Sequence, residues 1–154
     1  MANQPERMPD VPTVAGIRCR VGKAEIGLPL DGVGQIIEYP VVALPLARRF
    51  IAGVGLHQGR PLLSIALGRL PEKPRGQQRS TRGILLDVGR SDQIEWALEV
   101  DQMGTFVRAT LLPQAPANPE LPPWISQARD AEGKLLGWID VAAMLADLAG
   151  AEER

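Results

Sequence analysis

Few side chains in this 154-residue chain could carry out a reaction, because it holds one histidine, His57, and one cysteine, Cys19. Ser64 would need a histidine and an acid beside it to become a nucleophile, and no G-x-S-x-G turn surrounds it. Cys19 alternates with Ile17 and Val21 in a strand-like segment, which favours a buried and inert thiol. We therefore expect no catalytic residue.

Patterns for cofactors and metals are also missing. Gly27, Gly32 and Gly34 lie near a predicted strand, but their spacing is not the G-x-G-x-x-G of a dinucleotide site. One cysteine and one histidine leave no zinc-ligand cluster. Glu99 and Asp101 would share a face of a strand, with no second carboxylate site that can be placed opposite them. The sequence predicts a protein without cofactor or metal that is not an enzyme.

Composition narrows the class of partner. Seventeen basic and eighteen acidic side chains give a formal charge of −1, so no overall field attracts nucleic acid or an anionic membrane. Nowhere do eighteen apolar residues follow one another, and segment 1–12 has three prolines and no apolar signal region. We expect a cytoplasmic protein with a disordered segment 1–12, no nucleic-acid binding and no membrane insertion. The basic run within 68–82 is typical of a solvated linker.

The secondary-structure pattern centres on one hairpin. Its apolar arms, Phe50–Leu56 and Leu62–Leu67, are joined by the turn His57–Pro61, which carries glycine and proline. One helix is expected after Asp140 as N-cap, with Gly150 at its end, and one helical turn at 46–50. Further strands are expected at 14–21, 24–30, 83–88, 94–100, 106–112, 124–128 and 134–139, with a brief one around 33–37. These elements predict an all-β barrel or sandwich with a C-terminal helix.

Five blocks of sequence, in order, resemble the CheW-like family of chemosensory coupling proteins. The blocks are Ala24–Leu30 (A-E-I-G-L-P-L), Val33–Ile37 (V-G-Q-I-I), Phe50–Val54 (F-I-A-G-V), Ala97–Met103 (A-L-E-V-D-Q-M) and Gly133–Val141 (G-K-L-L-G-W-I-D-V). Each block by itself is an apolar strand with a small residue or a turn. Their order along most of the chain is what makes the resemblance specific.

The resemblance implies one CheW-like domain over 13–150, built as two small five-stranded SH3-like β-barrels side by side. We expect the first barrel to span 13–67 together with the helix at 141–149, and the second to span 83–139. Members of the family are not enzymes. They join the cytoplasmic tip of a methyl-accepting chemoreceptor to the regulatory domain of a CheA-type histidine kinase, and they pair with other CheW-like proteins in receptor arrays.

The resemblance also predicts the interface residues. For the receptor these are Val33, Gln35, Ile36, Phe50 and Gln58; for the kinase they are Leu56, His57, Gln58 and Gly59. The family's turn reads N-L-R-G where this chain has L-H-Q-G, and the glutamate of V-x-E-I is Gln35. Glutamine cannot reproduce the charge-assisted bonds of an arginine or a glutamate, which weakens the expected contact by about 2 kcal/mol.

Three functions follow. We favour a divergent adaptor that holds the receptor and binds the kinase weakly or not at all, because core positions match the family while the turn does not. An ordinary coupling protein that binds both partners is the alternative. A small-ligand-binding β-barrel is the outside alternative; against it, the six aromatic residues are spread along the chain and form no sequence cluster.

Overall fold

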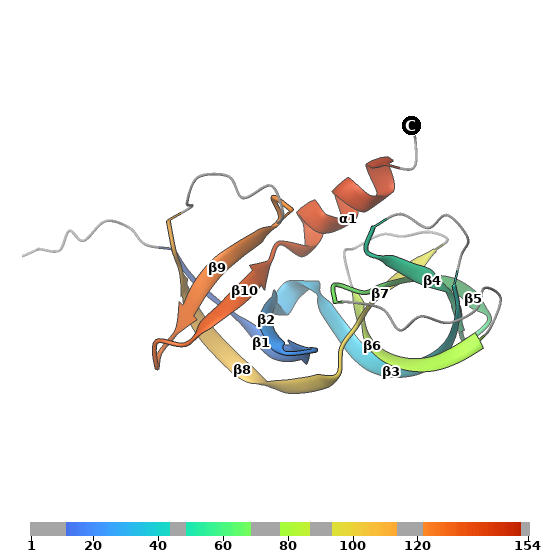
Figure 1. The fold of residues 1–154 in the computed structure, drawn as a ribbon, viewed down its shortest axis with the longest axis horizontal. Coiled ribbons are helices and arrows are strands. Elements are labelled where there is room, and N and C mark those ends of the chain that lie inside the picture. Colours follow the sequence, from blue (N-terminus) through green and yellow to red (C-terminus); the bar gives the residue numbers. More distant parts are fainter. Residues whose placement is uncertain (1–11, 44–48, 69–77, 87–93, 114–121, 152–154) are drawn as a thin grey trace, which may run out of the picture.

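Strands dominate the structure, and one helix follows them near the C-terminus (Figure 1). The computed structural model describes residues 12–43, 49–68, 78–86, 94–113 and 122–151. The elements are β1 (Thr13–Val21), β2 (Ala24–Pro29), the short 3₁₀ helix η1 (Leu30–Gly32), β3 (Val33–Val42), β4 (Ile51–His57), β5 (Arg60–Ile65), β6 (Gln78–Leu86), β7 (Glu95–Glu99), β8 (Gln102–Leu111), β9 (Ile125–Asp130), β10 (Leu135–Ile139) and α1 (Val141–Ala151).

The strands close into two five-stranded barrels, which confirms the predicted fold class. The central barrel has the strand order β3-β4-β5-β7-β6, and the terminal barrel has the order β1-β2-β10-β9-β8. The predicted division into 13–67 and 83–139 was therefore wrong: the central barrel is continuous in sequence, and the terminal barrel joins both ends of the chain. Hairpin signals report neighbouring strands, whereas barrel closure depends on pairings such as β1 with β8 and β2 with β10.

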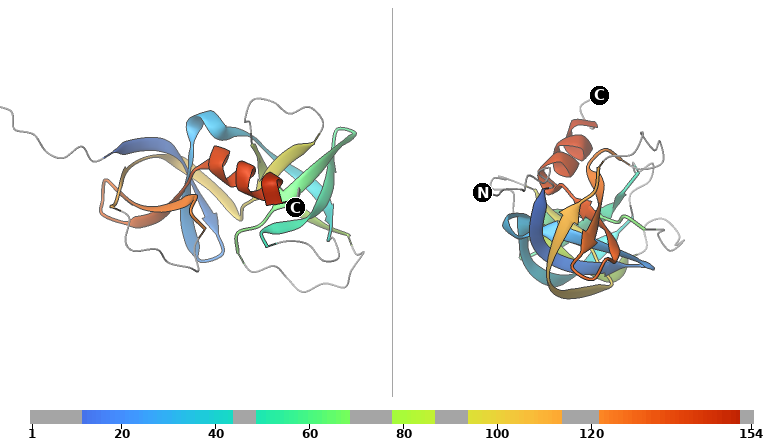
Figure 2. Two further views of the ribbon diagram at one scale, coloured as in Figure 1. Left: turned by 90° about the horizontal axis from the view of Figure 1, so that it is seen from above. Right: turned by 90° about the vertical axis from the view of Figure 1, so that its left-hand side faces the viewer.

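Both barrels follow one plan. In the central barrel, the run β3-β4-β5 is closed by β6 and β7, with β7 parallel to β5. In the terminal barrel, the run β8-β9-β10 is closed by β1 and β2, with β2 parallel to β10. The strands of the first half of the chain, β1–β5, are thus equivalent in order to those of the second half, β6–β10. Each half gives its first two strands to the barrel that the last three strands of the other half form. Figure 2 shows the two barrels lying side by side.

Among the described residues, buried apolar side chains form three clusters. The largest, called here the main core, lies between the barrels and α1; its buried members are Cys19, Ile26, Leu28, Ile51, Ile65, Ile84, Leu86, Leu98, Val100, Trp124, Ile139, Val141, Met144, Leu145 and Leu148. The terminal barrel is filled by Val107, Ala109, Ala128, Leu136 and Trp138. The central barrel is filled by Tyr39, Val41, Leu62 and Ala97. Because the main core takes residues from both barrels, the barrels form one packed unit.

Helix α1 begins as predicted. The Asp140 side chain accepts a hydrogen bond from the Ala143 backbone N–H at 3.1 Å, which is an N-cap. The buried stripe of α1 faces the main core and ties both barrels to the helix. The predicted end at Gly150 was one residue short, because the helix continues to Ala151. At C-terminal helix ends, such differences are small and common.

Other boundaries also changed. The predicted brief strand at 33–37 is β3, ten residues long, because Tyr39 and Val41 continue its inward face. The predicted linker 68–82 overlaps β6, which begins at Gln78 and pairs with β3. A basic segment can therefore be strand when its partner lies far away in sequence. Two predictions fall on residues that the structure does not describe. These are the disordered segment 1–12, of which only residue 12 is described, and the helical turn at 46–50, of which only residues 49 and 50 are described.

Candidate functional site: two docking surfaces

The predicted receptor residues at the start of β3 are only partly accessible. Val33 is half-buried, packs on the main core and pairs with Leu86 of β6. Gln35 is exposed, and Ile36 leaves 38% of its surface exposed although it pairs with the buried Ile84. Ile36 and Gln35 are therefore available to a partner, whereas Val33 mainly supports the core behind them.

The sequence prediction missed Phe106 of β8, which is 52% exposed. It pairs with Ile17 of β1, whose half-buried side chain packs on the main core, and the Arg108 guanidinium lies 5.8 Å from the phenyl ring. The alternation of exposed Phe106 and Arg108 with buried Val107 and Ala109 is the signal that could have revealed it. An exposed aromatic beside an arginine is typical of protein interfaces.

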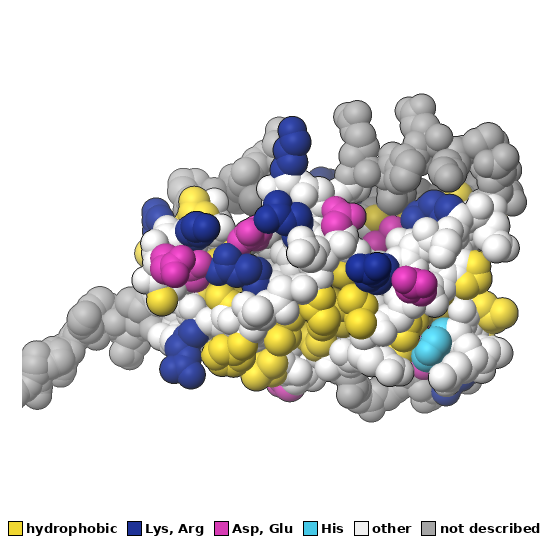
Figure 3. Space-filling model, turned by 90° about the horizontal axis from the view of Figure 1, so that it is seen from below, with side chains coloured by type: hydrophobic (Ala, Val, Ile, Leu, Met, Phe, Trp, Pro, Cys, Tyr) yellow, Lys and Arg dark blue, Asp and Glu magenta, His cyan; other side chains and the backbone are white. Residues whose placement is uncertain are grey.

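Ile36 and Phe106 hold equivalent places in the two barrels. Each lies two residues beyond a glycine that presses on a neighbouring strand: a Cβ on Gly34 would lie 3.0 Å from a carbonyl oxygen of β6, and one on Gly104 would lie 2.9 Å from a carbonyl oxygen of β1. Strands β3 and β8 run along the side of the molecule that faces away from α1 (Figure 1). Figure 3 shows hydrophobic side chains extending across both barrels on this side, called here the β3–β8 face.

Phe50 lies elsewhere. Its ring packs edge-on against Trp124, with centroids 5.3 Å apart and planes at 69°. The Arg49 guanidinium lies 4.6 Å from the centroid of the Phe50 ring. Trp124 in turn donates a hydrogen bond from Nε1 to Asp147 of α1 at 2.9 Å. These contacts associate Phe50 with the helix side of the barrel junction, apart from Ile36.

The predicted kinase residues form the turn between β4 and β5. Gln58 and Gly59 have φ of 54° and 79°, the left-handed pair that a two-residue hairpin turn requires. Leu56 is 54% exposed, and His57 Nδ1 lies 3.1 Å from Oε1 of Glu95. Gln58, predicted for both partners, is exposed at the tip of this hairpin and belongs to the turn rather than to the β3–β8 strands.

A second apolar surface surrounds this turn. Leu56 pairs with Pro61, and in the row behind them Val54, Leu63 and Trp96 lie opposite one another on β4, β5 and β7. Ile94, 41% exposed, precedes β7 beside this row. We call this set the outer face of the central barrel: Val54, Leu56, Pro61, Leu63, Ile94 and Trp96. Of these, Leu63 and Trp96 are half-buried and also pack against the main core. This face is the second candidate docking surface.

The candidate reactive groups do not converge. Ser64 is fully buried: its hydroxyl donates to Glu99 Oε2 at 2.6 Å and contacts the Tyr39 hydroxyl at 2.8 Å, while His57 contacts Glu95. Burial raises the pKa of the Cys19 thiol to about 11, so the reactive thiolate is disfavoured. Glu99 and Asp101, predicted to share a face, have separate partners. Within the described residues, no group of three His, Cys, Asp or Glu side chains could hold a metal.

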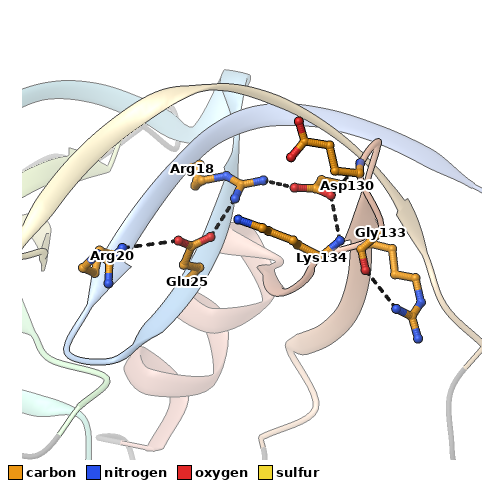
Figure 4. A network of polar contacts seen from close by, with 8 residues as sticks. Arg18, Arg20, Glu25, Asp130, Gly133 and Lys134 are labelled. Carbon is orange, nitrogen blue, oxygen red and sulfur yellow. Dashed lines mark hydrogen bonds and ion pairs between the residues drawn. The ribbon is translucent and has the colours of Figure 1, made fainter.

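A charged cluster joins strands of the terminal barrel (Figure 4). Arg18 bonds to Glu25 at 2.6 Å and to Asp130, and Arg20 lies 3.5 Å from Glu25. Asp130 also accepts backbone hydrogen bonds in the β9–β10 turn, including one from Lys134 at 2.8 Å. The Arg18 hydrogen bond holds the pKa of Asp130 below its usual range. The cluster links β1, β2 and β9 and has a structural role.

The structure is thus a pair of barrels filled by their own side chains, with apolar side chains exposed on two surfaces. A family model of the CheW-like domain matches residues 15–149, so the chain belongs to the CheW-like family. The solved structure of the scaffolding protein TtCheW from Thermoanaerobacter tengcongensis is similar, with a TM-score of 0.56 and 14% identity over 82% of this chain and 88% of that chain. This likeness shows a shared fold. No curated protein matches the sequence. No helix among the described residues is long and apolar enough to cross a membrane.

Proposed function

We propose that this protein is a non-enzymatic adaptor of a chemosensory array, which holds a chemoreceptor's cytoplasmic tip and has a weakened contact with a CheA-type histidine kinase. The observation that carries the proposal is the pair Ile36 and Phe106, which are exposed at equivalent places of β3 and β8 in a CheW-like fold. The adaptor acts in the cytoplasm and is recruited to receptor arrays. Its partners there include other CheW-like proteins.

The β3–β8 face is the surface proposed for the receptor. A receptor tip is a helical hairpin, and such a hairpin presents apolar side chains along its length that can contact one anchor on each barrel. Gln35 beside Ile36 replaces the family's glutamate, so a neutral hydrogen bond takes the place of a charged one. Anchors near the centre of an interface contribute most of its binding energy.

Titration calorimetry against a receptor signalling-tip fragment tests this proposal. Ile36→Arg and Phe106→Arg should each weaken binding by about 10- to 100-fold, because a charge replaces an apolar anchor. Leu135→Arg is the matched control: Leu135 is 51% exposed at the start of β10, and β9 separates it from β8. Equal loss in all three variants, or none in the first two, contradicts the proposal.

The outer face of the central barrel is the surface proposed for the kinase. Leu56 and Gln58 stand where the resemblance expects asparagine and arginine, so this surface is apolar and lacks the family's charged contact. We expect weak or undetectable binding to the kinase regulatory domain. The double variant Leu56→Asn with Gln58→Arg should strengthen binding about ten-fold or more, because a charge-assisted bond is regained.

Titration of the regulatory domain with the wild-type protein separates the divergent adaptor from the ordinary coupling protein. Binding in the micromolar range or tighter would return the protein to the ordinary class. The small-ligand alternative has less support: both barrel interiors are filled by side chains. An open hollow of about 670 Å³ lies beside Trp138 and the start of α1.

A further inference from the structure

The two halves of the chain meet at an aromatic pair. Phe50 precedes β4 and Trp124 precedes β9, the equivalent strand of the other barrel. The Phe50 carbonyl accepts a hydrogen bond from the Ala66 N–H at 2.9 Å, and the Trp124 carbonyl accepts one from the Asp140 N–H at 2.9 Å. Ala66 and Asp140 follow the equivalent strands β5 and β10. The two rings therefore touch at the pseudo-two-fold axis that relates the halves.

Phe50 is held in a backbone conformation that its side chain disfavours. Its φ is 72°, in the left-handed region, which is uncommon for a bulky residue. The Ala66 hydrogen bond, the Arg49 guanidinium and the Trp124 ring hold it there. A strained residue persists where its surroundings over-determine it, and such residues gather at functional positions.

Trp124 connects this pair to a third element. The indole is 3% exposed, and its N–H bonds to Asp147 on the outer side of α1. The surrounding contacts of the main core are mostly aliphatic, and aliphatic packing has no directional preference. An edge-to-face pair and an N–H···O bond do have preferred geometries. They can therefore define an angle as well as a distance.

We propose that Phe50 and Trp124 are positioning residues that fix the angle between the two barrels, and so the spacing of Ile36 and Phe106 across the β3–β8 face. The link to docking rests on the proposed function. The link to the inter-barrel angle does not, and it can be measured without a partner. Phe50 then acts on the receptor through geometry, without touching it.

Distance measurement between spin labels tests the angle directly. Glu132→Cys in the β9–β10 turn and Ser80→Cys on β6 place exposed labels on the terminal and central barrels. Cys19, 1% exposed, stays unlabelled. The unaltered protein should give one narrow distance distribution. Phe50→Ala should broaden or shift it, and Trp124→Phe, which keeps an aromatic ring but removes the Nε1 bond, should do so to a smaller extent.

Binding of the receptor signalling-tip fragment is measured on the same variants. Phe50→Ala should weaken it about five-fold or more per folded molecule, as expected for coupling between distant sites. Phe106→Ala is the matched control, which should weaken binding and leave the distance distribution unchanged.

A Phe50→Ala protein that melts earlier but keeps the wild-type distance distribution overturns the proposal, because Phe50 would then be an ordinary packing residue. If Phe50→Ala does not fold, Phe50→Leu and Trp124→Phe decide in the same way. A tip fragment that binds neither the wild type nor any variant contradicts the proposed function, while the distance distributions still decide the positioning role.

Discussion

The two barrels share a strand plan but are filled by different chemistry. In the terminal barrel, Trp138 fills the interior, and Cβ atoms on Gly16 and Gly27 would lie 2.8 and 2.5 Å from its ring. In the central barrel, Ser64 holds the place equivalent to Trp138, and Tyr39 supplies the large ring. One barrel pairs a large side chain with glycines, and the other pairs a tyrosine with a polar network.

That network determines how the central barrel is held together. Glu99 accepts hydrogen bonds from Ser64 at 2.6 Å, from Arg79 at 2.8 Å and from Thr81 at 3.3 Å. Glu99 therefore links β5, β6 and β7, the strands whose pairing closes the barrel. The interior of the terminal barrel is instead held together by apolar contacts. The same backbone plan is thus stabilised by apolar area in one copy and by directional bonds in the other. When one partner of a buried directional bond is removed, the other partner is left unsatisfied.

The largest expected effect is in the terminal barrel. Trp138→Ala should lower the free energy of unfolding by about 3–5 kcal/mol, because the glycines that contact the ring cannot close the cavity. Chemical denaturation with a far-UV signal measures it. Trp96→Ala removes the same side chain from the half-buried outer face of the central barrel and should cost less. Equal losses would mean that the interior of the terminal barrel collapses around the cavity.

In the central barrel, Glu99→Leu should cost about 3 kcal/mol, because Arg79 and Ser64 lose their acceptor while nearly buried. Adding Arg79→Met should recover part of this loss, since no unpaired charge then remains. The comparison is a double-mutant cycle by denaturation. Additive losses would show that Arg79 and Glu99 do not act as a pair, and the contrast between the barrels would weaken.

Tyr39 reports on the central barrel alone, because it is the single tyrosine. Burial raises its pKa to about 12, an effect partly offset by the Ser64 hydrogen bond. The folded state therefore favours the neutral phenol. This stabilisation is complete below the ordinary value of about 10 and is lost as pH rises through 12.

Ultraviolet absorbance of the phenolate should thus appear about two pH units above that of free tyrosine. Ser64→Ala should move the transition to still higher pH. A titration at the ordinary value in folded protein would show that the network is open to water.

The smallest expected effect concerns the Arg18–Asp130 cluster of the terminal barrel. The pKa of Asp130 is lowered, so its contribution to stability is complete above the ordinary aspartate value of about 4 and is lost as pH falls through the folded value. Asp130→Asn should reduce this acid sensitivity, measured as the difference in unfolding free energy between pH 6 and pH 3. An unchanged pH slope would show that the Arg18 cluster contributes nothing measurable.

Local patterns predicted the parts of the fold whose signals are local. The hairpin of β4 and β5, the β9–β10 turn and the Asp140 cap follow from turn glycines, apolar alternation and a capping side chain within a few residues of one another. Ile36 and Leu56 belong to recognisable strand motifs, and both are exposed. Their roles with receptor and kinase remain predictions.

Tertiary structure decided the rest. Which strands share a barrel depends on pairings such as β2 with β10, whose residues lie far apart in sequence and carry no local mark of one another. Those pairings also determine that Phe106 is exposed and that Phe50 contacts Trp124. An alternating pattern shows which residues of a strand share a face, but it does not show which other element covers that face. The sequence determined the elements and the family, while long-range strand pairing determined which side chains remain free for a partner.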